Sequence, residues 1–430
     1  MTTQVEPPGA RSGTRNYVLF LLLMLTILSF VDRQVLTILL DPIKHELALT
    51  DTQLGALTGV FFSLFYAAAG LPLARLADGR EKRSFIAACI AGWSIATVFT
   101  GLAMNFVQLA ISRTLVAVGE AGCAPATASL IGDLFPPNRR ARVFSAMSAA
   151  SAVGLGGGIF LGGSLSEHFG WRSVFLFLGI PGAALALLFL FTLPRGDALM
   201  VKVKPPPMLE TMKSFWRIRC YRVGIIVTLT AGTGAYGMLG WMATLLIRTH
   251  HLPRSQVGLY LGISMVTGLL IGNAVCGQVT DRLAARDSRW LLRVMGFSLF
   301  GVIPLALCAF FAKDVTVSLV AFCLTMISLG FWSPIMSTMV IGLVPRETRA
   351  VSASFNGIFQ SLGAASGPLV VGFLTDRLTP ALGADAIRYS LALSMIFTGI
   401  GATTALIGTR FIQAEYRPNG TDGGEAAAAI

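Results

Sequence analysis

Stretches of about 20 predominantly apolar residues recur along the whole chain of 430 residues. Each stretch is long enough to cross the hydrocarbon core of a bilayer, about 30 Å thick, as one helix. Only 13% of the residues are charged, whereas soluble proteins are about 25% charged. The sequence therefore predicts an all-α integral membrane protein and disfavours a large soluble helical protein.

We predict twelve transmembrane helices in two six-helix bundles, with boundaries good to a few residues. The predicted spans are 16–40, 52–77, 83–104, 106–134, 141–167, 171–193, 221–248, 255–280, 290–312, 314–343, 350–375 and 387–413. The predicted domains are a cytoplasmic tail 1–15, an N-terminal bundle 16–193, a cytoplasmic linker 194–220, a C-terminal bundle 221–413 and a disordered cytoplasmic tail 414–430. The linker holds three consecutive prolines and then a basic, partly amphipathic stretch that indicates a surface helix.

The distribution of basic residues predicts the orientation. If the N-terminus is cytoplasmic, about 24 of the 33 lysines and arginines lie on the cytoplasmic side and about seven on the other side. This asymmetry predicts a multi-pass protein with both termini in the cytoplasm. The net charge of +12 then reflects topology and anionic lipid headgroups, and we expect no nucleic-acid partner. The short loops, together with the family resemblance given below, favour a bacterial inner membrane.

One signature recurs at the ends of four spans. "GLPLARLADGREKR" follows span two and "GNAVCGQVTDRLAARD" follows span eight, and each has a small residue, an acid (Asp78, Asp281) and then basic residues. Spans five and eleven end similarly, in "GGSLSEHFGWR" and "GFLTDRLTP". The spacing indicates a unit of three helices used four times, with neighbouring units inverted. Nested inverted three-helix repeats are typical of transporters that rock around a site near the midplane.

The loop 74–83 resembles the cytoplasmic loop motif of the major facilitator superfamily, although Ala74 and Gly79 replace a usual glycine and arginine. Small residues let helices approach closely, and a carboxylate can face the positive N-terminus of a neighbouring helix. We expect a cytoplasmic gate that contacts the start of span eleven, 349–354. The alternative is a basic loop that only sets topology. The predicted gate residues are Arg75, Asp78, Arg80, Arg83, Asp281 and Arg282.

Two longer stretches are similar to the spinster-like branch of that superfamily. "VDRQVLTILLDPIKHELALTDTQLGALTG" resembles its first helix and "SRTLVAVGEAGCAPATASLIGDLFPP" its fourth. The resemblance implies that the matched positions Asp32, Arg33, Arg113 and Glu120 line a central cavity. It also implies that the acids take part in proton coupling and that the cargo is lysophospholipid- or sphingolipid-like. Anion symporters of the superfamily carry a comparable Asp-Arg pair, which leaves that branch open.

The chemistry of these four residues supports a functional site. A charge at the centre of a bilayer costs about 3 kcal/mol on insertion scales, so such residues face water or a partner. Arg113 and Glu120 are seven residues apart, which places them on one helix face about 10 Å apart along the axis. We assign proton coupling to Asp32 and Glu120. Arg33 keeps its charge, as does Arg113, and both are candidates for binding an anionic substrate. The alternative is a static network of buried ion pairs that fixes helix packing.

The second half lacks a matching intramembrane acid between Val223 and Val344. Its spans instead offer aromatic and amide side chains, which favour an amphiphile with a charged head and an apolar chain. Core packing is the alternative role for each aromatic. The further substrate-binding candidates are Tyr236, Trp241, Trp332 and Asn356.

Other chemistry is not indicated. The six cysteines lack C-x-x-C spacing and the four histidines are scattered, so we predict no metal site and no cofactor. A phosphate-binding loop is missing from the sequence, which argues against ATP-driven transport. We predict a monomeric, proton-coupled secondary transporter, with protons, membrane lipids and a lipid-like or organic-anion substrate as partners. The alternatives are a membrane sensor or receptor, a hexuronate or organic-anion symporter, and a drug exporter. We do not expect an enzyme, because the sequence shows no clustered nucleophile and base.

Overall fold

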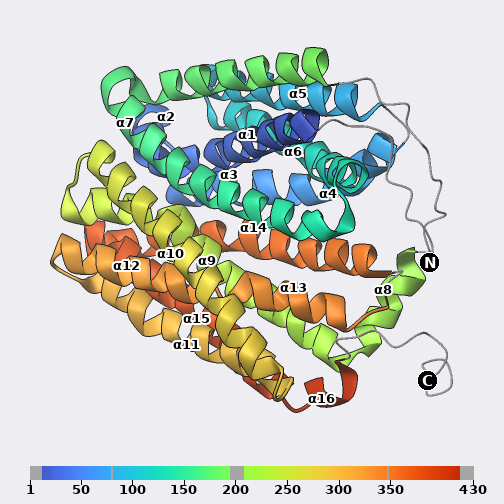
Figure 1. Cartoon of the computed structure of the whole chain (residues 1–430). Helices are drawn as coiled ribbons and strands as arrows, with labels where there is room; N and C mark the ends of the chain where they lie inside the picture. Colours follow the sequence, from blue (N-terminus) through green and yellow to red (C-terminus); the bar gives the residue numbers. More distant parts are fainter. Residues whose placement is uncertain (1–11, 79–80, 194–207, 346–347, 417–430) are drawn as a thin grey trace, which may run out of the picture.

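The computed structural model describes residues 12–78, 81–193, 208–345 and 348–416, and within these ranges all regular structure is helical. Two bundles lie side by side, the N-terminal half above and the C-terminal half below (Figure 1). The N-terminal half contains α1 (Ser12–Ile38), α2 (Leu40–Leu47), α3 (Asp51–Thr58), α4 (Val60–Asp78), α5 (Lys82–Leu102), α6 (Phe106–Leu134) and α7 (Pro137–Thr192). The C-terminal half contains α8 (Met208–Arg217), α9 (Arg219–His250), α10 (Arg254–Ala284), α11 (Arg289–Phe311), α12 (Val315–Leu329), α13 (Trp332–Gly342), α14 (Arg349–Leu382), the 3-10 turn η2 (Gly383–Asp385), α15 (Ala386–Gly408) and α16 (Ile412–Glu415).

Ten helical stretches among the described residues are long and apolar enough to span a membrane. Two of them, with 51 and 58 residues, would measure about 77 and 87 Å as straight helices, more than twice the bilayer core. Each folds back on itself. The first turns at Gly170, whose φ of 76° is in the left-handed region, and the second turns at η2, before α15. The chain thus crosses twelve times, which confirms the predicted fold class.

Two predicted spans are interrupted helices. The span 52–77 is formed by α3 and α4, which meet at Gly59, and the span 314–343 is formed by α12 and α13. In the second case Gly330 lies directly against the backbone of Gly272 in α10. Pro334 follows four residues later and has no N–H to bond the Gly330 carbonyl. Close helix contact and a missing backbone donor together account for this break.

We call the side on which α1 begins and α15 ends the near side, and the opposite side the far side. The near side is on the right in Figure 1 and the far side on the left. On the near side the linker helix α8 packs on the C-terminal half. Its Phe215 ring stacks on Tyr221 of α9 at 5.1 Å, and Tyr221 stacks on Phe355 of α14 at 6.0 Å. The predicted surface helix is therefore anchored to one half by buried aromatic rings.

On the far side the two halves touch through their backbones. A Cβ atom added at Gly55 of α3 would lie 2.3 Å from the Pro368 carbonyl oxygen of α14. One added at Gly156 of α7 would lie 2.5 Å from the Gly262 carbonyl oxygen of α10. Any larger residue would force these helices apart, so the glycines permit close contact between the halves. The seams α3–α14 and α7–α10 thus close the far side.

Candidate functional site

The structure brings together the four charged residues that the sequence singled out. Arg33 Nε on α1 lies 2.6 Å from Glu120 Oε2 on α6. Arg113 Nη1 on α6 lies 3.7 Å from Asp32 Oδ2 on α1. Asp32, Arg113 and Glu120 are each at most 4% exposed. Two adjacent residues of one helix thus pair with residues two turns apart on its neighbour, and the set lies inside the N-terminal half.

Hydroxyl groups from two helices support the acids. Ser29 Oγ donates to Glu120 Oε2 at 2.8 Å, and Thr97 Oγ1 on α5 donates to Asp32 Oδ2 at 3.1 Å. The second oxygen of each carboxylate, Asp32 Oδ1 and Glu120 Oε1, is buried without a hydrogen-bond partner among the described residues. Each acid therefore keeps one free acceptor oxygen, on which a proton can be held without breaking a hydrogen bond.

Aromatic rings surround the Arg33 guanidinium. Its central carbon lies 5.1 Å from the ring centre of Phe30, 4.9 Å from that of Phe62 and 4.6 Å from that of Tyr66. Contacts of this kind are attractive and worth about 0.5–2 kcal/mol each. The sequence analysis did not identify Phe62 and Tyr66. Their spacing of four residues on α4 was the available signal, because it places both rings on one helix face next to an unsolvated arginine.

The C-terminal candidates lie in different environments. Tyr236 of α9 is half-buried, interacts with the side chain of Gln360 and is within electrostatic range of Arg33 across the interface between the halves. Half-buried Asn356 accepts a hydrogen bond from Thr228 Oγ1 at 3.1 Å. Tyr236 is thus the C-terminal candidate that the structure places opposite the N-terminal charges.

The two candidate tryptophans, Trp241 and Trp332, are buried in the C-terminal half. Trp241 is fully buried, and its indole N–H donates to the Pro368 carbonyl at 3.0 Å. This bond joins α9 to α14, so the packing alternative describes Trp241 in this conformation. Trp332 is 8% exposed, and its indole nitrogen has no partner among the described residues. Its ring packs 3.5 Å from the position of a Cβ on Gly232.

The near-side gate residues are only partly described. Arg80 lies outside the described residues, as do the side chains of Asp78 and Asp281, so the predicted contact with α14 stays a prediction. Arg75 is exposed, as is Arg282. Arg83 serves the N-terminal half itself: its Nη1 donates to the Leu193 carbonyl at 3.1 Å, and its Nε lies 3.3 Å from Glu81.

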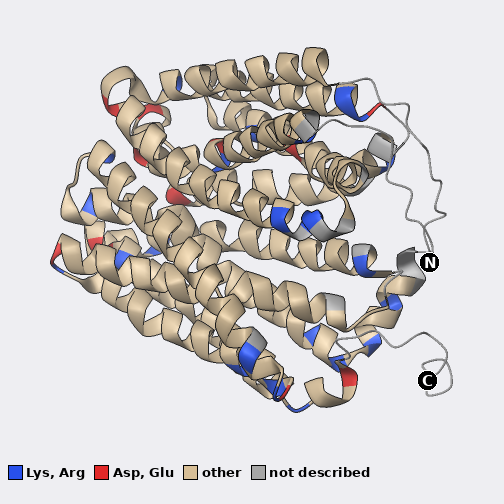
Figure 2. Cartoon of the chain, in the orientation of Figure 1, with Lys and Arg blue, Asp and Glu red and all other residues tan. Residues whose placement is uncertain are grey.

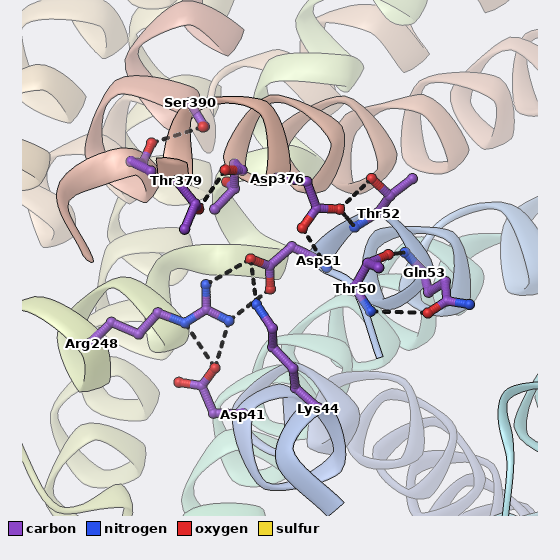
Figure 3. Close-up of polar contacts among 12 residues, drawn as sticks. Asp41, Lys44, Thr50, Asp51, Thr52, Gln53, Arg248, Asp376, Thr379 and Ser390 are labelled. Atoms are coloured by element: carbon purple, nitrogen blue, oxygen red, sulfur yellow. Dashed lines mark hydrogen bonds and ion pairs between the residues drawn. The ribbon is translucent and has the colours of Figure 1, made fainter. Parts of the chain in front are cut away.

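A second cluster of charges, on the far side, joins the two halves (Figure 3). Arg248 of α9 donates to both oxygens of Asp51 at 3.0 and 2.7 Å and lies 2.7 Å from Asp41. Lys44 Nζ lies 2.7 Å from Asp51 Oδ2. Asp376 of α14 accepts hydrogen bonds from the backbone N–H of Asp51 and Thr52 at 3.0 and 2.7 Å. The sequence analysis missed this cluster, for which the position of charges at the ends of predicted spans was the only signal.

Comparison with known proteins places the chain in a family. Residues 22–368 match the Major Facilitator Superfamily. An MFS-type efflux pump of Mycolicibacterium smegmatis is 30% identical and covers 85% of this chain and 86% of the relative. The sphingosine-1-phosphate transporter SPNS2 of Danio rerio is 26% identical over an alignment that covers 85% of this chain and 77% of that protein. A probable L-galactonate transporter of Escherichia coli is 26% identical over an alignment that covers 89% of this chain and 87% of that protein.

A solved structure shares the architecture. A bacterial homologue of the human lysosomal transporter spinster, inward-facing and unoccupied, matches with a TM-score of 0.84 and 26% identity, covering 95% of this chain and 100% of that one. These relatives are transporters, which supports the expectation that the chain is not an enzyme. The chain belongs to the Major Facilitator Superfamily and is a spinster-like membrane transporter.

Proposed function

We propose that this transporter works by alternating access, is coupled to protons and moves an amphiphilic lipid-like or organic-anion substrate. The observation that supports this most directly is the pair of buried contacts Arg33–Glu120 and Arg113–Asp32 between α1 and α6. Packing alone rarely requires four charges in a bilayer, where each costs about 3 kcal/mol. Two acids that hold two permanent cations can exchange a proton while the arginines keep their charge.

The Arg33–Glu120 pair suggests how a proton and an anion are linked. The Arg33 side chain is 26% exposed and that of Glu120 only 1%, so Arg33 is the member that a substrate can reach. An anionic headgroup and the Glu120 carboxylate then compete for one guanidinium. Protonation of Glu120 frees Arg33, and the rings of Phe62 and Tyr66 keep it in place. Proton binding and anion binding therefore favour each other, as reciprocal linkage requires.

The closed far side supports an inward-facing state in a bacterial inner membrane. The Arg248–Asp51 contacts close the far side, and the similar spinster homologue is also inward-facing. In Figure 2 more lysine and arginine lie toward the near side on the right than toward the far side, whereas acids lie at both ends. By the positive-inside rule the near side is cytoplasmic, with both termini. The central pairs would then exchange protons and substrate with the cytoplasm.

The relatives support two kinds of substrate. Proteins named as transporters of sphingosine-1-phosphate and of L-galactonate both match this chain, and the substrates in these names are anions. Arg33 can bind either kind through its planar donors. Tyr236 of the other half lies within electrostatic range of Arg33, and an aromatic ring at this position favours the lipid-like class. We assign the protein as a monomer that contacts membrane lipids, protons and one such substrate.

Transport by purified protein in liposomes tests the proposal. We expect uptake or efflux of lysophospholipid, sphingosine-1-phosphate or a sugar acid to increase with an imposed pH gradient. Asp32→Asn and Glu120→Gln keep the size of the side chain and remove its titration, so they should bind substrate but lose gradient-driven transport. Glu46→Gln is the matched control, because Glu46 pairs with Arg172 on the far side of the same half. Full gradient-driven transport by both central variants would refute coupling at this site.

The same assay distinguishes a transporter from a sensor or receptor that uses the same fold. It would bind one of these ligands, as seen by a thermal shift, without moving it across the membrane under any gradient. Transport of any tested anion by wild-type protein would exclude this alternative.

A further inference from the structure

Two acids at matching ends of the two halves each bond the other half. Glu167 of α7 is the last residue of predicted span five, and Asp376 of α14 directly follows predicted span eleven, in the repeated stretches "GGSLSEHFGWR" and "GFLTDRLTP". Glu167 Oε2 accepts from the Ser255 N–H at the start of α10, at 3.0 Å. Asp376 accepts from the backbone N–H of Asp51 and Thr52 at the start of α3, at 3.0 and 2.7 Å. An acid of the N-terminal half thus bonds the start of a helix in the C-terminal half, and an acid of the C-terminal half bonds the start of a helix in the N-terminal half.

Each contact satisfies a need of the helix that receives it. The first backbone N–H groups of a helix have no partner within it, and the helix dipole places partial positive charge there. Ser255 is the second residue of α10, and Thr52 the second of α3. A carboxylate from the opposite half therefore serves as an N-terminal cap that stabilises the helix.

We propose that Glu167 and Asp376 are paired positioning residues of the transport cycle, which hold the far side closed by capping helices of the opposite half. The inference rests on the proposed alternating access, since the caps must break when the halves separate on the far side. It also gives a physical meaning to the acids that recur at the ends of spans five and eleven.

Arginines on the same side make the opposite kind of contact. Arg172 Nη1 donates to the carbonyl groups of Gly101 and Ala103 at the end of α5, at 3.2 and 2.5 Å. Arg388 Nη1 donates to the Phe310 carbonyl at the end of α11, at 2.8 Å. Each of these three bonds stays within one half, so a rigid-body movement of the halves leaves them intact. These arginines provide matched controls for the two acids.

The two caps differ in strength. Asp376 accepts a third hydrogen bond, from Thr52 Oγ1 at 2.6 Å, and lies next to the Arg248–Asp51 contacts (Figure 3). Glu167 is exposed, and among the described residues its hydrogen bonds come from one residue, Ser255, whose N–H lies 3.0 Å from Glu167 Oε2. We therefore expect the loss of Asp376 to shift the balance between closed and open states more than the loss of Glu167.

Distance measurement between the halves tests the proposal. Spin labels at Met104 and Lys313, in exposed far-side loops of the two halves, are placed in a background without the six native cysteines. Double electron–electron resonance measures the distribution of distances between the two labels. This distribution gives the ratio of far-side-open to far-side-closed molecules. We expect Glu167→Gln to raise this ratio about threefold and Asp376→Asn about tenfold, the latter equivalent to about 1.4 kcal/mol. The double variant should raise it by about the product, because both caps act on one equilibrium.

Removal of the donors gives an independent test if an acid variant folds poorly. Ser255→Pro and Thr52→Pro delete the donating N–H groups at helix positions where proline is tolerated, and they should reproduce the corresponding shifts. Arg172→Ala and Arg388→Ala should lower the melting temperature and leave the distance ratio unchanged. Equal shifts from the arginine variants would overturn the proposal, because general destabilisation would then explain the result.

A bulky substitution at the interface between the halves, which we call the wedge, distinguishes failure of this inference from failure of alternating access. Gly55→Leu places side-chain atoms where the Pro368 carbonyl lies and must separate α3 from α14. If the wedge opens the far side and the cap variants do not, the capping role is wrong and alternating access stands. If folded wedge protein also keeps the wild-type distances, both proposals are wrong. Opening by the wedge and by the cap variants supports both.

Discussion

Arg248 of the C-terminal half and Asp51 of the N-terminal half are joined by two hydrogen bonds of 3.0 and 2.7 Å on the far side. Asp51 is fully buried, and its own backbone N–H bonds Asp376 of the C-terminal half. One residue of the N-terminal half therefore contacts the C-terminal half through its side chain and its main chain. This double contact makes Asp51 the best point at which to perturb the closed far side.

Arg248→Ala should destabilise the closed state by about 3 kcal/mol, because it leaves a buried carboxylate with fewer partners. Arg248→Lys should recover only part of this, since an ammonium group cannot reproduce the planar bidentate contact of a guanidinium with a carboxylate. Labelling of a single cysteine at Asn105, in the far-side loop after α5, is not expected to change. Labelling of a cysteine at Ser29, beside Glu120, by an impermeant reagent applied on the far side should increase. Unchanged labelling at Ser29 in Arg248→Ala would show that this pair does not hold the gate.

Arg113→Ala should impair the central site in a different way from Arg113→Lys. Alanine leaves buried Asp32 without its cation, and we expect a loss of about 3 kcal/mol in the free energy of unfolding. Lysine keeps a charge and should retain most of the stability, while transport falls because the planar fork is lost. Thermal unfolding and liposome transport, measured on both variants, separate the two effects. Equal transport by Arg113→Lys and wild type would remove Arg113 from the substrate site.

Tyr66→Leu and Phe62→Leu should weaken substrate binding more than they weaken the fold. Each removes a ring 4.6 or 4.9 Å from the Arg33 guanidinium, an interaction worth about 1 kcal/mol, or about fivefold in affinity. The effect should appear when Arg33 is released from Glu120, so it should be larger at low pH. Binding isotherms at two pH values provide the measurement. A pH-independent effect would assign the rings to packing alone.

Glu46 gives the protein a pH-dependent contribution to stability on the far side. The hydrogen bond from the Trp171 indole, together with Arg172, lowers the pKa of the Glu46 carboxyl below its ordinary value. A group whose pKa is lowered by folding stabilises the folded state above its unfolded pKa, and this contribution is lost as the pH falls through the folded pKa. Glu46→Gln should therefore melt below wild type at pH 7 and match it in strong acid. A difference that persists below about pH 3 would indicate that the carboxylate charge is not involved.

The sequence predicted the crossings well because each crossing needs its own apolar run. The turn at Gly170 separates two spans whose predicted ends are 167 and 171, since a glycine between apolar runs marks the reversal. The interruption between α12 and α13 was not predicted. It depends on the contact of Gly330 with Gly272 of another helix, and no local pattern records such a contact.

The residues of the candidate site could be predicted from the sequence, but the way in which they pair could not. Charges inside apolar runs identify Asp32, Arg33, Arg113 and Glu120, but the rotation of α1 against α6 decides which acid meets which arginine. The far-side contacts of Arg248 involve helices from different halves and could not be inferred from spacing. Trp241 shows the limit for single aromatics, because a tryptophan that packs α9 on α14 has the same local sequence pattern as one that lines a cavity.

The anchoring of α8 has a practical consequence for engineering. Because Phe215 stacks on Tyr221 of the C-terminal half, the chain between Leu193 and α8 is the covalent tether between the two bundles. A gene divided at this tether would encode two fragments, one ending after α7 and one beginning with α8, each carrying its own set of six crossings. Co-expressed fragments with fluorescent reporters on their new ends would convert assembly of the transporter in living cells into an optical signal.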